Sequence, residues 1–114
     1  MNISRLYKRL KKLEEQIEVI REYVDTARHG LQTISNELEQ RAKCYKPKSD
    51  LQRAIVSNAF LCPKRMLDLT DKTLQLAFMD KEQRMSEESK MKIEMLNILK
   101  DKLSSMAVID REEK

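Results

Sequence analysis

The first third of the chain carries an unbroken apolar seam, and this feature constrains the fold most. Its apolar residues recur at alternating spacings of three and four, the period of a helix that packs along one face. A single apolar stripe has no fold of its own, so it must be buried against another helix, from this chain or from another. The sequence therefore indicates a protein that works by helical association. The seam consists of Ile3, Leu6, Leu10, Leu13, Ile17, Ile20, Val24, Ala27, Leu31, Ile34 and Leu38.

The composition agrees with a long helical protein. Charged residues make up 37% of the 114 residues, and one Gly and two Pro leave little to interrupt a helix. With two Phe, three Tyr and no Trp, we expect an elongated molecule instead of a large compact core. No segment approaches the roughly 18 consecutive apolar residues of a membrane span, and no secretory apolar region follows the basic first residues. We therefore expect a cytoplasmic protein, or a nuclear one if the source is eukaryotic.

Prolines and capping residues divide the chain into predicted helices. A first helix is expected over residues 2–45, continuous through Gly30 because the seam keeps its phase there. Pro47 ends this helix, since it lacks a backbone N–H and disfavours helical geometry at the residue before it. Ser49 and Gln52 have the spacing of a capping box, which starts a short helix over residues 50–61.

A third helix is expected over residues 63–108, because Pro63 suits the first position of a helix. Residues 110–114 should fray. The prediction is a single all-α domain, an elongated coiled-coil helical hairpin of two long antiparallel helices joined by a short central helix. In this arrangement the end of the third helix packs on the seam. The residues expected to do so are Leu96, Leu99, Leu103 and Met106.

The hairpin leaves part of the seam poorly covered. Residues 80–94 of the third helix are mainly polar, and an antiparallel hairpin places them against the stretch from Ile17 to Ala27. Half-covered Ile and Val side chains cost on the order of 1 kcal/mol each. This mismatch predicts a partner helix over that stretch. A hetero-oligomer is the expected assembly, and a homo-oligomer stays open.

A parallel pair of identical first helices is only weakly specified by its flanking residues. With Ile3 at heptad position a and Leu6 at position d, the flanking pairs between copies begin with Arg9 and Glu14. That pair is the only attractive ion pair among the four, since the others combine Gln16 with Arg21, Tyr23 with Arg28, and Gly30 with Ser35. These flanks do not direct the seam to a copy of itself.

Two further groups of residues are candidate partner sites. The short helix presents apolar side chains on more than one face, either as a docking tip or as a cap that closes the hairpin, and methionines in the third helix suit a surface that repacks around a partner. The docking candidates are Leu51, Ile55, Val56, Phe60, Met85 and Met91.

The first helix also carries a basic run around Leu6 and Leu10. Such residues are the ordinary outward positions of a coiled coil, but they could also contact an acidic partner, a membrane surface or nucleic acid. The candidate contacts are Arg5, Lys8, Arg9, Lys11 and Lys12.

No constellation of an enzyme is present in the sequence, and no cofactor or metal site is expected. A single Gly excludes a glycine-rich phosphate loop, and there is no GxSxG or HExxH motif. His29 near Asp25 is interpreted as a solvated pair, and Cys44 and Cys62 as free thiols. The predicted function is that of a non-enzymatic coiled-coil interaction subunit or adaptor in a multiprotein complex. The first alternative is a small chaperone that shields a helical client. The second alternative, ranked after it, is a basic helix protein bound to a membrane surface or nucleic acid.

Overall fold

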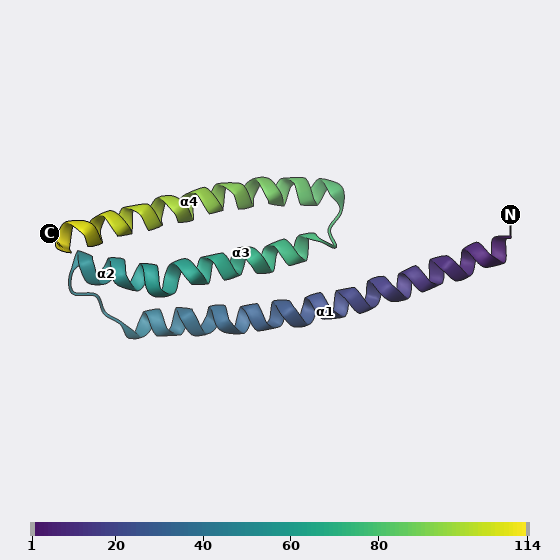
Figure 1. The fold of residues 1–114 in the computed structure, drawn as a ribbon, viewed down its shortest axis with the longest axis horizontal. Helices are drawn as coiled ribbons and strands as arrows, with labels where there is room; N and C mark the ends of the chain where they lie inside the picture. The colour runs from purple at the N-terminus through teal and green to yellow at the C-terminus, as the bar shows by residue number, and fades with distance from the viewer. Residues whose placement is uncertain (1, 114) are drawn as a thin grey trace.

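The computed structural model describes residues 2–113 and the side chains of residues 2–112. The protein is an all-α, elongated helical hairpin, as predicted, with extents of 75 × 26 × 19 Å (Figure 1). Its elements in chain order are α1 (Ile3–Cys44), α2 (Asp50–Val56), the π-helical turn η1 (Ser57–Leu61), α3 (Cys62–Leu76) and α4 (Lys81–Glu113).

Local sequence accounts for both ends of α1. The Asn2 side chain accepts a hydrogen bond of 3.0 Å from the Ser4 N–H and so caps the helix. The helix continues through Gly30, and a Cβ atom placed on this residue would meet nothing within 4 Å. It ends at Cys44, before the extended residue Tyr45 and Pro47.

The start of α2 also follows the sequence. The Ser49 hydroxyl oxygen accepts a hydrogen bond of 3.2 Å from the Gln52 N–H, as a capping box requires. The Gln52 side chain accepts one of 2.9 Å from the N–H of Lys48, one residue earlier than in the standard motif. The cap therefore fixes where the chain leaves the extended link after α1.

The structure corrects the predicted helix bounds at Pro63. The short helix predicted over residues 50–61 does not stop there, because α2, η1 and α3 follow one another without a break. In η1 the Cys62 N–H donates to the Ser57 carbonyl, a bond one residue longer than in an α-helix. Such a widened turn interrupts the regular hydrogen-bond ladder just before Pro63, whose missing N–H would otherwise break it.

The second correction concerns the helix predicted over residues 63–108, which is interrupted by a turn at residues 77–80. There the N–H groups of Ala77, Phe78 and Met79 bond to carbonyls three residues back, which tightens the end of α3. The Phe78 ring lies under the Arg21 guanidinium, whose Cζ atom is 5.0 Å from the ring centroid. A contact with α1 therefore accompanies the turn, and α4 reverses direction after it.

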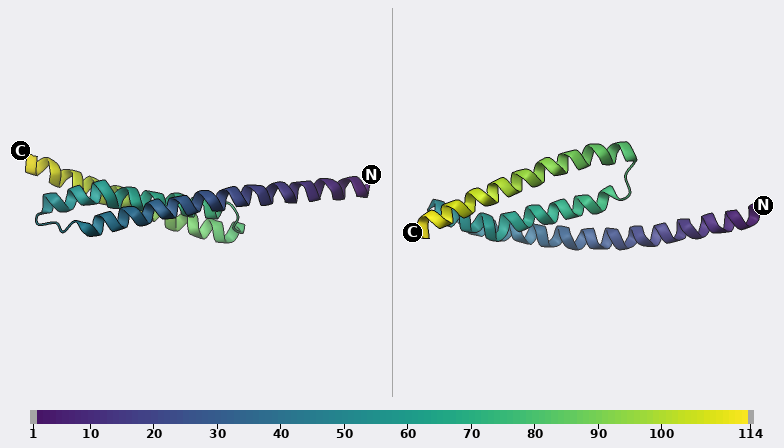
Figure 2. Two further views of the ribbon diagram at one scale, coloured as in Figure 1. Left: turned by 90° about the horizontal axis from the view of Figure 1, so that it is seen from below. Right: turned by 45° about the horizontal axis from the view of Figure 1, so that its top comes forward.

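The continuous unit of α2, η1 and α3 lies between α1 and α4 (Figures 1 and 2). It contacts α1 through η1 and α3, and it contacts α4 along its whole length. The core is small, and its most buried side chains come mainly from this central unit. They are Ala54, Cys62, Leu69 and Leu76, with Ile98 from α4 and the polar Ser35 from α1.

Candidate interaction surface

The amino-terminal part of α1 projects beyond the rest of the molecule (Figures 1 and 2). Residues 2–23 are all exposed, and we call residues 3–20 the arm. The arm is about 27 Å long at 1.5 Å per residue. The apolar side chains of its seam are exposed by between 42% at Leu6 and 80% at Ile3, so none of them has a place in the core. They are Ile3, Leu6, Leu10, Leu13, Ile17 and Ile20.

Helix α3 covers only one side of the predicted seam in the remainder of α1. Val24, Leu31 and Leu38 are half-buried, whereas Ala27 and Ile34 stay exposed. The positions that α3 covers in place of these two include Arg28 and Ser35. The face that α3 covers is thus rotated around α1 away from the predicted seam, and an interface at Ala27 and Ile34 stays a prediction.

Two carboxylates of α3 account for this rotation. Asp71 accepts a hydrogen bond of 2.8 Å from Arg28 Nε and one of 3.3 Å from Gln32 Nε2. Asp68 accepts one of 2.5 Å from the buried Ser35 hydroxyl, and Lys64 Nζ lies 2.7 Å from its other oxygen. Buried polar groups need such partners, so these pairs orient α1 toward α3. Sequence reasoning missed them, because a partner on another helix leaves no local pattern.

The result is an apolar line along α1 that the described residues leave uncovered. We call it the open seam, and it runs through the arm and continues on the body beside α3. The polar segment 80–94 does not lie against Ile17–Ala27 as predicted, because the turn at residues 77–80 carries it to the other side of α3. The uncovered region begins at Ile3 instead. The open seam consists of Ile3, Leu6, Leu10, Leu13, Ile17, Ile20, Ala27 and Ile34.

Helix α4 packs on the central unit and not on the seam. Lys72 Nζ lies 3.0 Å from Glu87, and Arg65 lies 2.9 Å from Asp101. The hydrogen bond from Lys72 lowers the pKa of the Glu87 carboxyl below its ordinary value. The inward residue of the helix is Ile98. The four residues predicted to pack on the seam are instead exposed: Leu96, Leu99, Leu103 and Met106.

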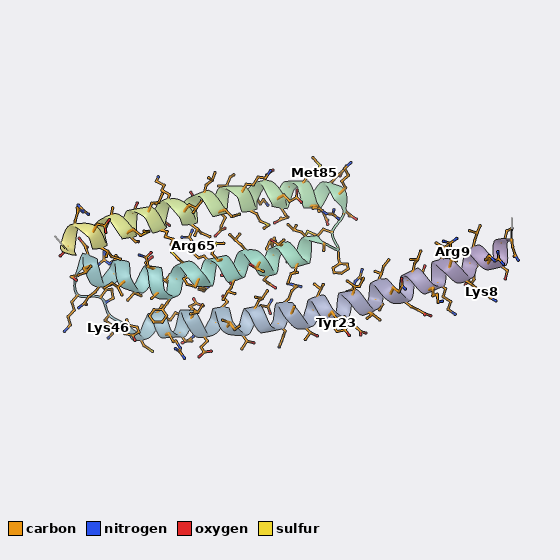
Figure 3. The ribbon with its side chains drawn as sticks, viewed as in Figure 1. Lys8, Arg9, Tyr23, Lys46, Arg65 and Met85 are labelled. Carbon is orange, nitrogen blue, oxygen red and sulfur yellow. The ribbon has the colours of Figure 1, made fainter. Side chains whose placement is uncertain are left out.

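The basic run lies at the tip of the arm, where Figure 3 shows Lys8 and Arg9 on the part of α1 that projects beyond the other helices. All five of its side chains are exposed, and they alternate with the apolar residues of the open seam. The structure therefore brings the predicted acidic-partner contacts and the predicted coiled-coil interface together on one segment. These contacts are Arg5, Lys8, Arg9, Lys11 and Lys12.

The predicted docking residues fall into two separate places. At the elbow between α1 and α2, Phe60 stacks on Tyr45 with ring centroids 5.4 Å apart, and the exposed Ile55 helps to line a cleft of 470 Å³. Leu51 and Val56 are half-buried in the same region. Met85 is exposed near the start of α4 (Figure 3), and Met91 lines a groove of 320 Å³ between α3 and α4. The six residues therefore do not form one docking surface.

The titratable and thiol groups singled out by the sequence form no metal or disulfide site in the described residues. Asp25 and His29 are exposed on α1, Cys44 is exposed and Cys62 is buried, with both thiols free. Within residues 2–113, no three His, Cys, Asp or Glu side chains gather as metal ligands would. In the same range, no helix combines the length and the apolar character that crossing a membrane requires.

Comparison of the chain with protein-family models, with curated proteins and with solved structures found no match.

Proposed function

We propose that this protein is a non-enzymatic interaction subunit or adaptor that pairs its α1 helix with a partner helix in a protein complex. The observation that supports the proposal is the arm, a helix of 18 residues with an apolar stripe that nothing in the described chain covers. An amphipathic helix in water needs a second surface against which its stripe is buried. A helix lying along the open seam would provide that surface.

The energetics support pairing more than they support an isolated arm. Full burial of a Leu or Ile side chain contributes about 1.5–3 kcal/mol, and the six seam side chains of the arm have roughly half of this gain still to make. The gain is of the order of 1 kcal/mol for each side chain, on each of two partners. Association itself costs several kcal/mol, so only a partner with its own apolar stripe of similar length would bind stably.

A small chaperone for a helical client is the second candidate function. Its support is the groove between α3 and α4, which Leu76, Met91 and Met95 line. Flexible methionine side chains adapt to different apolar partners. A chaperone of this kind would bind unfolded or unassembled helices reversibly at the groove, whereas an adaptor would hold one partner along α1.

Site-specific photocross-linking in cells of the native source tests the proposed function. A photoreactive amino acid replaces Leu10 on the open seam in one variant and Met91 in the groove between α3 and α4 in a second. In a control variant it replaces Lys8, which is exposed and lies off the seam. We expect the Leu10 variant to form a cross-link with a protein chain and the Lys8 variant to form much less. Equal or absent cross-linking from both positions would contradict the proposal, and cross-links from Met91 alone would favour the chaperone.

A further inference from the structure

We propose that the open seam is occupied by a second copy of this chain, with the two α1 helices parallel and in register. This inference depends on the proposed function, because it names the partner helix. It begins from the uncovered heptad positions. In the arm these are Ile3, Leu10 and Ile17 at position a and Leu6, Leu13 and Ile20 at position d.

The shape of the open seam suits a parallel pair. Because α3 covers a rotated face of α1, the line of d positions stays exposed from Leu6 in the arm to Ile34 in the body. In a parallel pair in register, every residue of one α1 lies level with the same residue of the other α1. The whole line of exposed positions is then buried, and neither helix extends beyond the other. The arm combines Ile3 with Leu6, Leu10 with Leu13 and Ile17 with Ile20, of which only the first is the combination of a β-branched a and a leucine d that favours two strands. The core residues therefore do not decide the number of helices, and the two α3 helices limit it.

The charges beside the arm separate parallel from antiparallel pairing. One flank of the seam carries Arg5, Arg9 and Lys12, and the other flank carries Glu14 and Glu18 together with Lys11. In a parallel pair the first flank of each copy faces the second flank of the other. In an antiparallel pair equivalent flanks meet, so the cationic flank would face itself.

In the parallel arrangement, the charged flanking pair of the arm is Arg9 with Glu14 of the second copy. The twofold symmetry forms this pair twice in the dimer. The next flanking pair, Gln16 with Arg21 of the second copy, is neutral. On the body, Arg28 and Ser35 already bond to α3 and place no free charge at the seam. The arrangement therefore carries attraction near its tip and no like-charge pair along these core-flanking positions.

The remaining helices of the two copies also fit around the paired α1 helices. A twofold axis along the paired α1 helices places the two α3 helices on opposite sides, since each α3 lies on the rotated face of its own α1. The pair of α1 helices then has an α3 helix in each outer groove, which is the layout of a four-helix bundle. The interface is closed, so it gives a dimer and not an open chain of molecules.

Sedimentation of the full chain, combined with disulfide trapping, tests the proposal. We expect a species of twice 13.5 kDa at micromolar concentrations. In a Cys44→Ser background, Leu13→Cys and Leu6→Cys should each form a disulfide-linked dimer on mild oxidation, because every d position faces its equivalent in a parallel pair in register, whereas an antiparallel pair brings equivalent residues together at one point at most. Val19→Cys is the matched control, equally exposed on the arm but off the seam, and it should form little.

A charge swap tests the pairing by a second readout. Arg9→Glu places two glutamates together at each flank and should weaken dimerisation about fivefold or more. The double variant R9E/E14R restores an oppositely charged pair and should recover most of the lost affinity. Because both variants keep the seam intact, a folding defect would be visible as a loss of helical circular dichroism and would not be reversed by the second substitution.

A monomer at these concentrations, or a dimer in which Leu13→Cys forms no more disulfide than Val19→Cys, would overturn the inference. These outcomes differ from failure of the proposed function. If photocross-linking at Leu10 captures a different protein while the chain sediments as a monomer, the proposed adaptor function stands and the proposed dimer is wrong. If Leu10 captures no protein and the chain is a monomer, both are wrong.

Discussion

Arg28 of α1 and Asp71 of α3 form a partly buried ion pair of 2.8 Å, eight residues after the end of the arm. Toward the amino terminus from this pair, Val24 is half-buried and Arg21 contacts Phe78 of the turn at residues 77–80. The pair therefore lies in the first part of α1 that packs on α3, near its boundary with the arm.

Replacing Asp71 should destabilise this boundary. Asp71→Ala leaves the half-buried Arg28 without its carboxylate and also removes the acceptor of Gln32. We expect a loss of about 1.5–3 kcal/mol in the free energy of unfolding, measured by urea titration. Asp101→Ala is the control, because that carboxylate pairs with Arg65 at the surface and should contribute less than about 1 kcal/mol. Equal losses would show that the pair does not anchor α1.

The inward face of α4 is tested by two neighbouring residues. Ile98 is 3% exposed and Leu99 is 54% exposed. Ile98→Ala should therefore cost about 2–4 kcal/mol in unfolding free energy, because it leaves a cavity between α4 and the central unit. Leu99→Ala should cost less than about 1 kcal/mol. The opposite order, in urea or thermal unfolding, would favour the predicted packing of Leu99 on the seam.

The pKa of Glu87 makes stability depend on pH. Its pKa is lowered from the ordinary value of 4.5, mainly by the hydrogen bond from Lys72. A carboxyl with a lowered pKa in the folded state adds stability above its unfolded pKa and loses it as the pH falls through the folded pKa. We expect wild type to be more stable than Glu87→Gln above pH 4.5, with the difference shrinking in more acidic solution.

Thermal unfolding across this pH range measures the effect. Glu88→Gln is the control, since Glu88 is the exposed neighbour of Glu87. Its stability relative to wild type should change little with pH. A difference between Glu87→Gln and wild type that persisted at low pH would contradict the role of this carboxyl.

Amide hydrogen exchange should divide α1 into two parts. In dilute protein the amides of residues 3–20 should exchange about tenfold faster, or more, than those of residues 28–42, because only the latter pack on α3. Raising the protein concentration should slow exchange in the arm if a second copy covers it. Uniform protection along α1 in dilute solution would show that the arm is stabilised by another contact.

Several elements could be predicted because they depend on residues close together in the chain. Residues a few positions away decide the capping of α2 by Ser49 and the end of α1 before Pro47. The need of the seam for a partner was also predicted, but its uncovered part was expected at Ile17–Ala27 and begins at Ile3. Pro63 was misjudged, because the π-helical turn before it absorbs its missing N–H, and no residue type announces such a turn.

The sequence by itself determined that this protein is a set of long amphipathic helices and that α1 carries more apolar surface than its own chain covers. Only the tertiary structure decided which face of α1 is covered, because Asp68 and Asp71 bond Ser35 and Arg28 across helices and rotate the contact away from Ala27 and Ile34. The tertiary structure also decided that the chain reverses direction at residues 77–80, between α3 and α4. Periodicity records that a stripe is buried, whereas the choice of what buries it depends on contacts between residues far apart in the chain.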